Sequence, residues 1–164
     1  MPSKRRIAAG AVWAGFIGMV GAGLASAAAA AVLKRRLPDR ARPEDDELDL
    51  VAIFDGRRLR SSSTAFRGGR ILCWYAGTDV DLRGATLDPA GAELLVWIVF
   101  GGTRVRVPEH WRVRMHGVAI FGGAGSMAQA PDDADPGPVL NVRCRTVFGG
   151  FGIMPEPDDE VLAV

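Results

Sequence analysis

The 164-residue sequence is poor in the side chains that most often carry chemistry, with only two cysteines and two histidines. Cys73 and Cys144 each stand in an apolar run and lack a C-x-x-C or other metal-ligand spacing. We interpret them as two buried thiols in a reducing compartment, with a disulfide and a metal site as alternatives. The sequence predicts no cofactor and no metal site.

A catalytic constellation is also missing. His110 and His116 have no serine or cysteine in a recognisable nucleophile motif to act upon. The acidic residues gather in two loop-like or tail-like stretches, residues 132–135 and 156–160, and lack a calcium-binding repeat. No Gly-Gly pair is followed by Lys-Ser or Lys-Thr, which excludes a phosphate-binding loop. We therefore predict that the chain is not an enzyme.

The chain also lacks an excess of positive charge, because its 20 lysines and arginines are nearly balanced by 19 aspartates and glutamates. Near-neutrality gives no reason to expect nucleic acid as a partner.

The N-terminal region contains a long run without charge. Residues 7–33 follow a basic tail of residues 1–6 and precede the basic cluster at residues 34–36. A run of this length predicts a transmembrane helix, and the alternative is a signal peptide cleaved near Ala27. The excess of basic residues after the run predicts a single-pass protein of the cell membrane with its large domain in the cytoplasm.

Small residues recur at every fourth position of this run, which favours either helix pairing in a homodimer or, as the alternative, simply an alanine- and glycine-rich sequence without pairing. They are Gly10, Ala14, Gly18, Ala22, Ser26 and Ala30.

The rest of the chain divides by composition. We predict a charged linker over residues 34–49, a β-repeat domain over residues 50–154 and an acidic C-terminal tail over residues 155–164. Short alternating apolar runs broken by glycine indicate strands and leave little room for helices.

The β-domain carries an internal repeat, in which an aromatic residue precedes a small residue or aspartate and then glycine. The motif occurs five times, and its corner residues are Phe54, Gly56, Tyr75, Gly77, Phe100, Gly101, Gly102, Phe121, Gly122, Gly123, Phe148, Gly149 and Gly150. The strand Thr78–Leu82 also aligns with Thr103–Val107. Each copy predicts a strand, a corner and a second strand, with the aromatic ring pointing inward. The glycines permit a backbone angle or a close approach that a Cβ atom would prevent.

Stacking such units predicts an all-β fold, a right-handed β-solenoid-like domain with an internal aromatic ladder behind one N-terminal transmembrane helix. A β-sandwich is the runner-up. The proline-rich and acidic residues 155–160 are expected to cap the last repeat.

The motifs resemble a known family. The segments VFGGTRVRVP at residues 99–108, GVAIFGG at residues 117–123 and VFGG at residues 147–150 are similar to the LiaF-like C-terminal domain of bacterial cell-wall-active antibiotics response proteins. The similarity covers residues 50–154. It implies a non-catalytic protein at the cytoplasmic membrane that restrains a sensor histidine kinase until cell-envelope stress, although one predicted membrane helix replaces the several of better-known members.

Together these patterns predict a non-enzymatic, membrane-anchored regulatory or scaffold protein that acts through a protein partner, and the resemblance implies a cell-envelope stress sensor as that partner. Two alternatives are a bactofilin-like solenoid that assembles at the membrane and an exported envelope-binding module. The alternating arginines of the repeat strands indicate either a solvated face or a surface for anionic lipid or an acidic partner. They are Arg104, Arg106, Arg112 and Arg114.

Overall fold

The computed structural model describes residue 25 and residues 27–37, 41–132 and 137–157. The chain divides into two compact units, Met1–Leu37 and Pro38–Val164. The described part of the first unit is a helix over residues 27–36, and at its end the Leu37 N–H donates to the Leu33 carbonyl at 2.9 Å.

The predicted fold is wrong in its transmembrane helix. Among the described residues, no helix has both the length and the apolar character needed to cross a membrane. At 1.5 Å per residue the helix over residues 27–36 rises roughly 15 Å, about half of a hydrocarbon core, and its last turn holds three basic residues. Residues 7–24 and 26 of the predicted span, with most of the small-residue stripe, lie outside the described residues.

The second unit is built from seven strands. They are β1 (Glu47–Ile53), β2 (Arg57–Arg60), β3 (Gly68–Trp74), β4 (Ala76–Asp81), β5 (Ala92–Pro108), β6 (Arg112–Ser126) and β7 (Val139–Glu156). Every pairing between them is parallel, which is the pattern of a solenoid and not of the antiparallel sheets of a sandwich.

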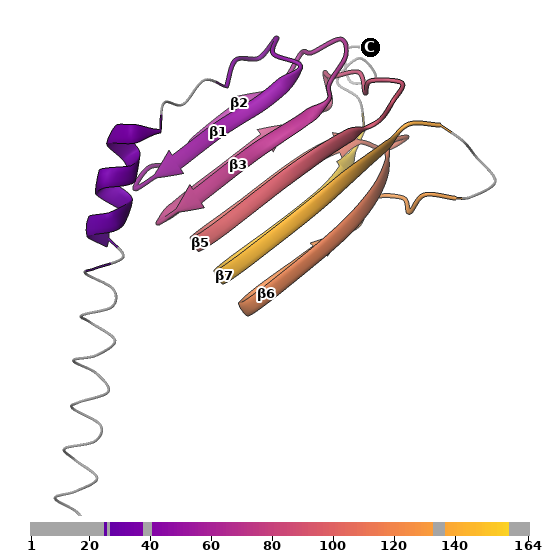
Figure 1. The fold of residues 1–164 in the computed structure, drawn as a ribbon. Helices are drawn as coiled ribbons and strands as arrows, with labels where there is room; N and C mark the ends of the chain where they lie inside the picture. Colours follow the sequence, from indigo (N-terminus) through magenta and orange to yellow (C-terminus); the bar gives the residue numbers. More distant parts are fainter. Residues whose placement is uncertain (1–24, 26, 38–40, 133–136, 158–164) are drawn as a thin grey trace, which may run out of the picture. The chain divides into compact units, whose positions relative to one another are not determined.

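The sheet is folded into two limbs (Figure 1). The first half of β5 pairs with β3 and its second half pairs with β4, because β5 runs through the corner that separates β3 from β4. The long strands β6 and β7 run through the same corner. The parallel sheet is therefore bent back on itself and nearly closed.

We call each strand-corner-strand unit a rung: β1 with β2, β3 with β4, and then β5, β6 and β7 each alone. The rungs do not stack in chain order, because β7 pairs with both β5 and β6 and so lies between them. The terminal rung of the stack is β6. Residues 155 and 156 of the predicted C-terminal cap belong to the inner rung β7, and residues 158–160 lie outside the described residues.

The core fills the space between the limbs with columns of inward side chains. Leu50, Ile71 and Val96 are neighbours across three rungs and are at most 1% exposed. Cys73 and Cys144 are free and buried, which confirms their interpretation as buried thiols. Burial raises the pKa of the Cys144 thiol, and the nearby Thr146 hydroxyl offsets part of that rise.

Candidate functional site

The aromatic residues of the repeat form one continuous ladder along the corner. The structure stacks them in the order Phe54, Tyr75, Phe100, Phe148 and Phe121. Successive ring centroids lie 5.4, 4.6, 4.8 and 4.7 Å apart, and successive rings are nearly parallel. The spacing follows the distance between neighbouring strands.

The ladder lies on the outside of the corner, and the prediction that the rings point inward is wrong. Phe54, Phe148 and Phe121 are 46%, 40% and 61% exposed. The interior next to the corner is already filled, because Ile98 before it and Val105 after it are at most 1% exposed. The rings are therefore left on the surface.

The first glycine after the ring is required by the fold in three rungs. Gly101, Gly122 and Gly149 have φ angles of 132°, 150° and 134°. A Cβ atom at any of them would lie 1.7–1.9 Å from a carbonyl oxygen of the neighbouring rung. Only glycine permits this backbone angle and this approach.

The fold does not require glycine in the same way at the second position after the ring, which we call the second glycine column. This column holds Gly56, Gly77, Gly102, Gly150 and Gly123, in stack order. A Cβ atom there would find either no atom within 4 Å or a nearest one at 3.6–3.8 Å. These five glycines therefore leave an open strip of backbone on the outer surface of the second limb.

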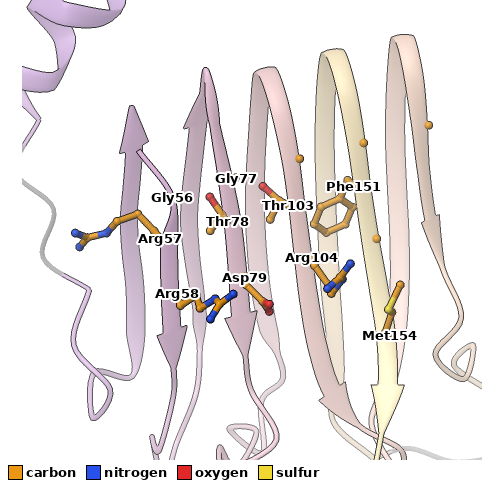
Figure 2. Close-up of a pocket in the computed structure, with 14 residues that line it drawn as sticks. Gly56, Arg57, Arg58, Gly77, Thr78, Asp79, Thr103, Arg104, Phe151 and Met154 are labelled. Carbon is orange, nitrogen blue, oxygen red and sulfur yellow. The ribbon is translucent and has the colours of Figure 1, made fainter. Parts of the chain in front are cut away.

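This strip is the floor of a groove of about 880 Å³, which we call the glycine groove (Figure 2). It crosses all five rungs. On the first three rungs its wall is the outward column Arg58, Asp79 and Arg104, which are direct neighbours across the strands. Gly152 and Met154 continue the lining on β7. A second depression of about 490 Å³ connects the same strip with the aromatic ladder.

The charge of the glycine groove is positive. Its lining includes Arg57, Arg58 and Arg104 against the single acid Asp79, a net charge of 3 − 1 = +2. Asp79 accepts a hydrogen bond from Arg106 at 3.0 Å. Arg58 and Arg104 are exposed and form no ion pair with a residue in the described part of the chain. They remain available for an acidic ligand.

Two buried hydroxyl groups lie beneath the groove floor. Thr78 and Thr103 are 5% and 4% exposed, and both line the groove. Within the described residues, neither Oγ1 atom has a hydrogen-bond partner. Buried polar atoms without partners are uncommon in folded proteins, which marks this part of the second limb as unusual.

A network of ion pairs lies at the end of the second limb that is farther from the corner. It joins Arg83 and Arg106 to three acidic residues, which are Asp79, Asp81 and Glu156. Asp81 accepts two side-chain hydrogen bonds from Arg83, at 2.9 and 2.7 Å, and both side chains are nearly buried. Glu156 lies 3.4 Å from Arg83 and 3.3 Å from Arg106, so β7 is tied to this network through a residue that the sequence assigns to a solvated tail. The Arg83 guanidinium holds the pKa of Asp81 below its ordinary value, although burial opposes this shift.

The network predicts a loss of stability in acid. A carboxylate whose pKa is lowered by folding stabilises the protein above its ordinary value of 3.8, and this contribution disappears as the pH falls through the lowered pKa. We expect Asp81→Asn to lower the urea midpoint clearly at about pH 7, and we expect its difference from the parent to shrink progressively as the pH falls below 3.8. A difference that stays constant between these pH values would contradict the role of the ionised carboxylate.

The other predicted residues are not brought together. His116 lies on β6, and His110 lies in the turn before it. Arg104 and Arg106 lie on the second limb, whereas Arg112 and Arg114 lie on the first, so the four arginines do not share one surface. Within the part of the chain that the structure describes, no group of three or more His, Cys, Asp and Glu residues could hold a metal ion.

The glycine groove was not among the sites predicted from the sequence, although the repeat contains a signal for it. Extending the alignment of Thr78 with Thr103 by one rung places Arg58 beside Asp79 and Arg104. A charged column beside a glycine column can be derived from that register, but its exposure cannot. Comparison with protein-family models, with curated proteins and with solved structures finds no match.

Proposed function

We propose that this chain is a non-enzymatic regulatory or scaffold protein whose β-domain binds an extended acidic segment of a partner protein along the glycine groove. The observation that carries the proposal is the open glycine floor, because the fold itself does not require glycine at those five positions. A floor of bare backbone lets another chain approach closely.

The dimensions and the charge support the same ligand. Five rungs at about 4.8 Å give a floor about 19 Å long, which accommodates about six residues of an extended peptide. Arg58 and Arg104 supply positive charge along one wall. The resemblance to the LiaF-like C-terminal domain favours a cell-envelope stress sensor, such as a sensor histidine kinase, as the partner.

A peptide-binding measurement tests this proposal. The probe is a fluorescein-labelled decapeptide of alternating glutamate and serine, and the reference peptide has lysine in place of glutamate. We expect the acidic probe to bind, and we expect Arg104→Glu to raise its Kd about tenfold or more because it reverses the charge of the groove wall. Fluorescence anisotropy measures both Kd values.

Two further variants separate groove binding from general attraction. Gly77→Leu fills the floor where a Cβ meets nothing, so the fold is expected to persist while the Kd rises about as much. Arg70→Glu makes the same charge change on the exposed surface of the first limb and is expected to change the Kd less than about twofold. Equal effects of Arg104→Glu and Arg70→Glu, or no binding of the acidic probe, would overturn the proposal.

A filament of stacked solenoids is less well supported, because the two ends of the stack differ. The first rung carries charged side chains on both limbs, among them Asp49, Arg57 and Arg58. Residues 117–127 of the terminal rung carry none. Head-to-tail stacking would place this uncharged surface on a charged one.

A further inference from the structure

The terminal rung β6 presents a long sheet edge to solvent. Among the described residues, β6 pairs with β7 on one side, and on the other only its start is covered, where the Val113 N–H donates to the Gln129 carbonyl at 2.9 Å. The remainder of the strand, from Arg114 to Ser126, faces no strand in that part of the structure. An uncovered edge is a template for pairing with another strand.

This edge lacks the devices that usually prevent pairing. Residues 117–127 contain no charge and no proline. All of them are exposed except Ala119, which is half-buried. Their large apolar side chains are exposed too: Val118 66%, Ile120 64%, Phe121 61% and Met127 78%. Such a surface is expected to be an interface.

The opposite end of the stack, the first rung, differs from β6 in the burial of its inward side chains. On β1 the inward side chains Leu48, Leu50 and Ala52 are 4%, 1% and 0% exposed. The matching inward positions of β6 include Gly117 and Ala119, which remain exposed and half-buried. The inward side chains of the first rung are therefore buried, whereas two of the inward positions of β6 are not. Among the described residues, the β6 end of the stack is the one that a partner could still cover.

The last ring of the aromatic ladder, on β6, has one face without a stacking partner among the described residues. Phe121 stacks on Phe148 with one face of its ring, and no ring of the described residues stacks on the other face. Every neighbour in the ladder is a ring on the corner of another rung. The surface that best continues the ladder is therefore another rung of the same kind.

We propose that β6 pairs edge to edge with β6 of a second copy of this chain. The strands run antiparallel about a two-fold axis, and the two stacks meet through their uncovered ends. Parallel pairing would set the basic starts of the two strands, Arg112 and Arg114, directly beside each other, whereas antiparallel pairing separates them. A two-fold interface also satisfies both free edges at once and leaves only the charged first rungs outside, so assembly stops at the dimer.

This inference concerns a different surface from the glycine groove wall and does not depend on the proposed ligand. It is tested on the full chain by sedimentation velocity and by disulfide crosslinking of single cysteine variants. Arg114→Cys, His116→Cys, Val118→Cys and Ile120→Cys place a thiol at exposed positions of β6, and Asp49→Cys is the control on the first rung. Cys73 and Cys144 stay in place because both are buried.

We expect a particle with the mass of two 17.4 kDa chains and disulfide-linked dimers from at least one β6 variant, but none from Asp49→Cys. A monomeric chain would overturn the proposal. A disulfide formed between the Val118→Cys and Asp49→Cys variants after mixing would also overturn it, because it would indicate head-to-tail stacking.

A charge-introducing variant provides the second measurement. Val118→Lys combined with Ile120→Lys changes two exposed side chains, so the near-ultraviolet circular dichroism of the β-domain is expected to be unchanged. The dimer is expected to dissociate at protein concentrations at least tenfold higher than for the parent. A dimer of unchanged affinity would overturn the assignment of the interface to β6.

Discussion

Gly149→Ala is expected to destabilise the β-domain by about 3 kcal/mol or more, because an alanine Cβ would lie 1.7 Å from the Gly101 carbonyl oxygen. The φ angle of 134° adds strain, since side chains other than glycine rarely adopt it. Gly149 belongs to β7, which lies between β5 and β6, so a shift of its backbone disturbs two interfaces. Urea denaturation measures the change as a lower midpoint.

The next residue supplies the matched control. Gly150→Ala makes the same substitution where the nearest atom to the new Cβ, the Gly123 carbonyl oxygen, is 3.8 Å away. We expect its free energy of unfolding to stay within about 1 kcal/mol of the parent value, because the smaller entropy of the unfolded chain offsets any loss. Similar effects of both substitutions would contradict the assignment of different roles to the two glycine columns.

Arg83→Leu is expected to destabilise the protein by about 3–5 kcal/mol, because it leaves Asp81 nearly buried without its main partner. The substitution also removes the contact from Arg83 to Glu156, which ties β7 to the turn after β4. Urea denaturation at neutral pH measures the loss. Combining Arg83→Leu with Asp81→Asn is expected to recover part of it, because the uncompensated charge is then absent.

An exposed ion pair on the first limb is the control for this prediction. Arg70 and Asp49 lie 3.1 Å apart, but their side chains are 69% and 41% exposed. Arg70→Leu is therefore expected to change the free energy of unfolding by less than about 1 kcal/mol. If Arg83→Leu has as small an effect as Arg70→Leu, the network at the end of the second limb is not a stabilising feature.

The register of the repeat was accessible from the sequence because it depends on local chemistry. Thr78 pairs with Thr103, and Asp81 pairs with Arg106, as the alternating pattern predicts. Side chains in a strand alternate between two faces, so aligning the glycine corners also aligns the residues that follow them. The burial of Cys73 and Cys144 follows from the apolar runs around them.

The membrane prediction had a weaker basis, since a count of uncharged residues does not show where a helix begins and ends. Within the described residues, the helix includes Lys34, Arg35 and Arg36, which the sequence analysis placed beyond it as a flank. Helix boundaries depend on the backbone hydrogen bonds that form, such as that from Leu37 to Leu33, and composition does not reveal them.

The sequence by itself determined that each repeat is a strand, a glycine corner and a strand, because the alternation and the glycines act over a few neighbouring residues. Only the tertiary structure decided the order of the rungs. Placing β7 between β5 and β6 depends on which edges pair in space, and any of the similar rungs offers nearly the same local pattern. Among the described residues, that choice leaves β6 as the uncovered end of the stack.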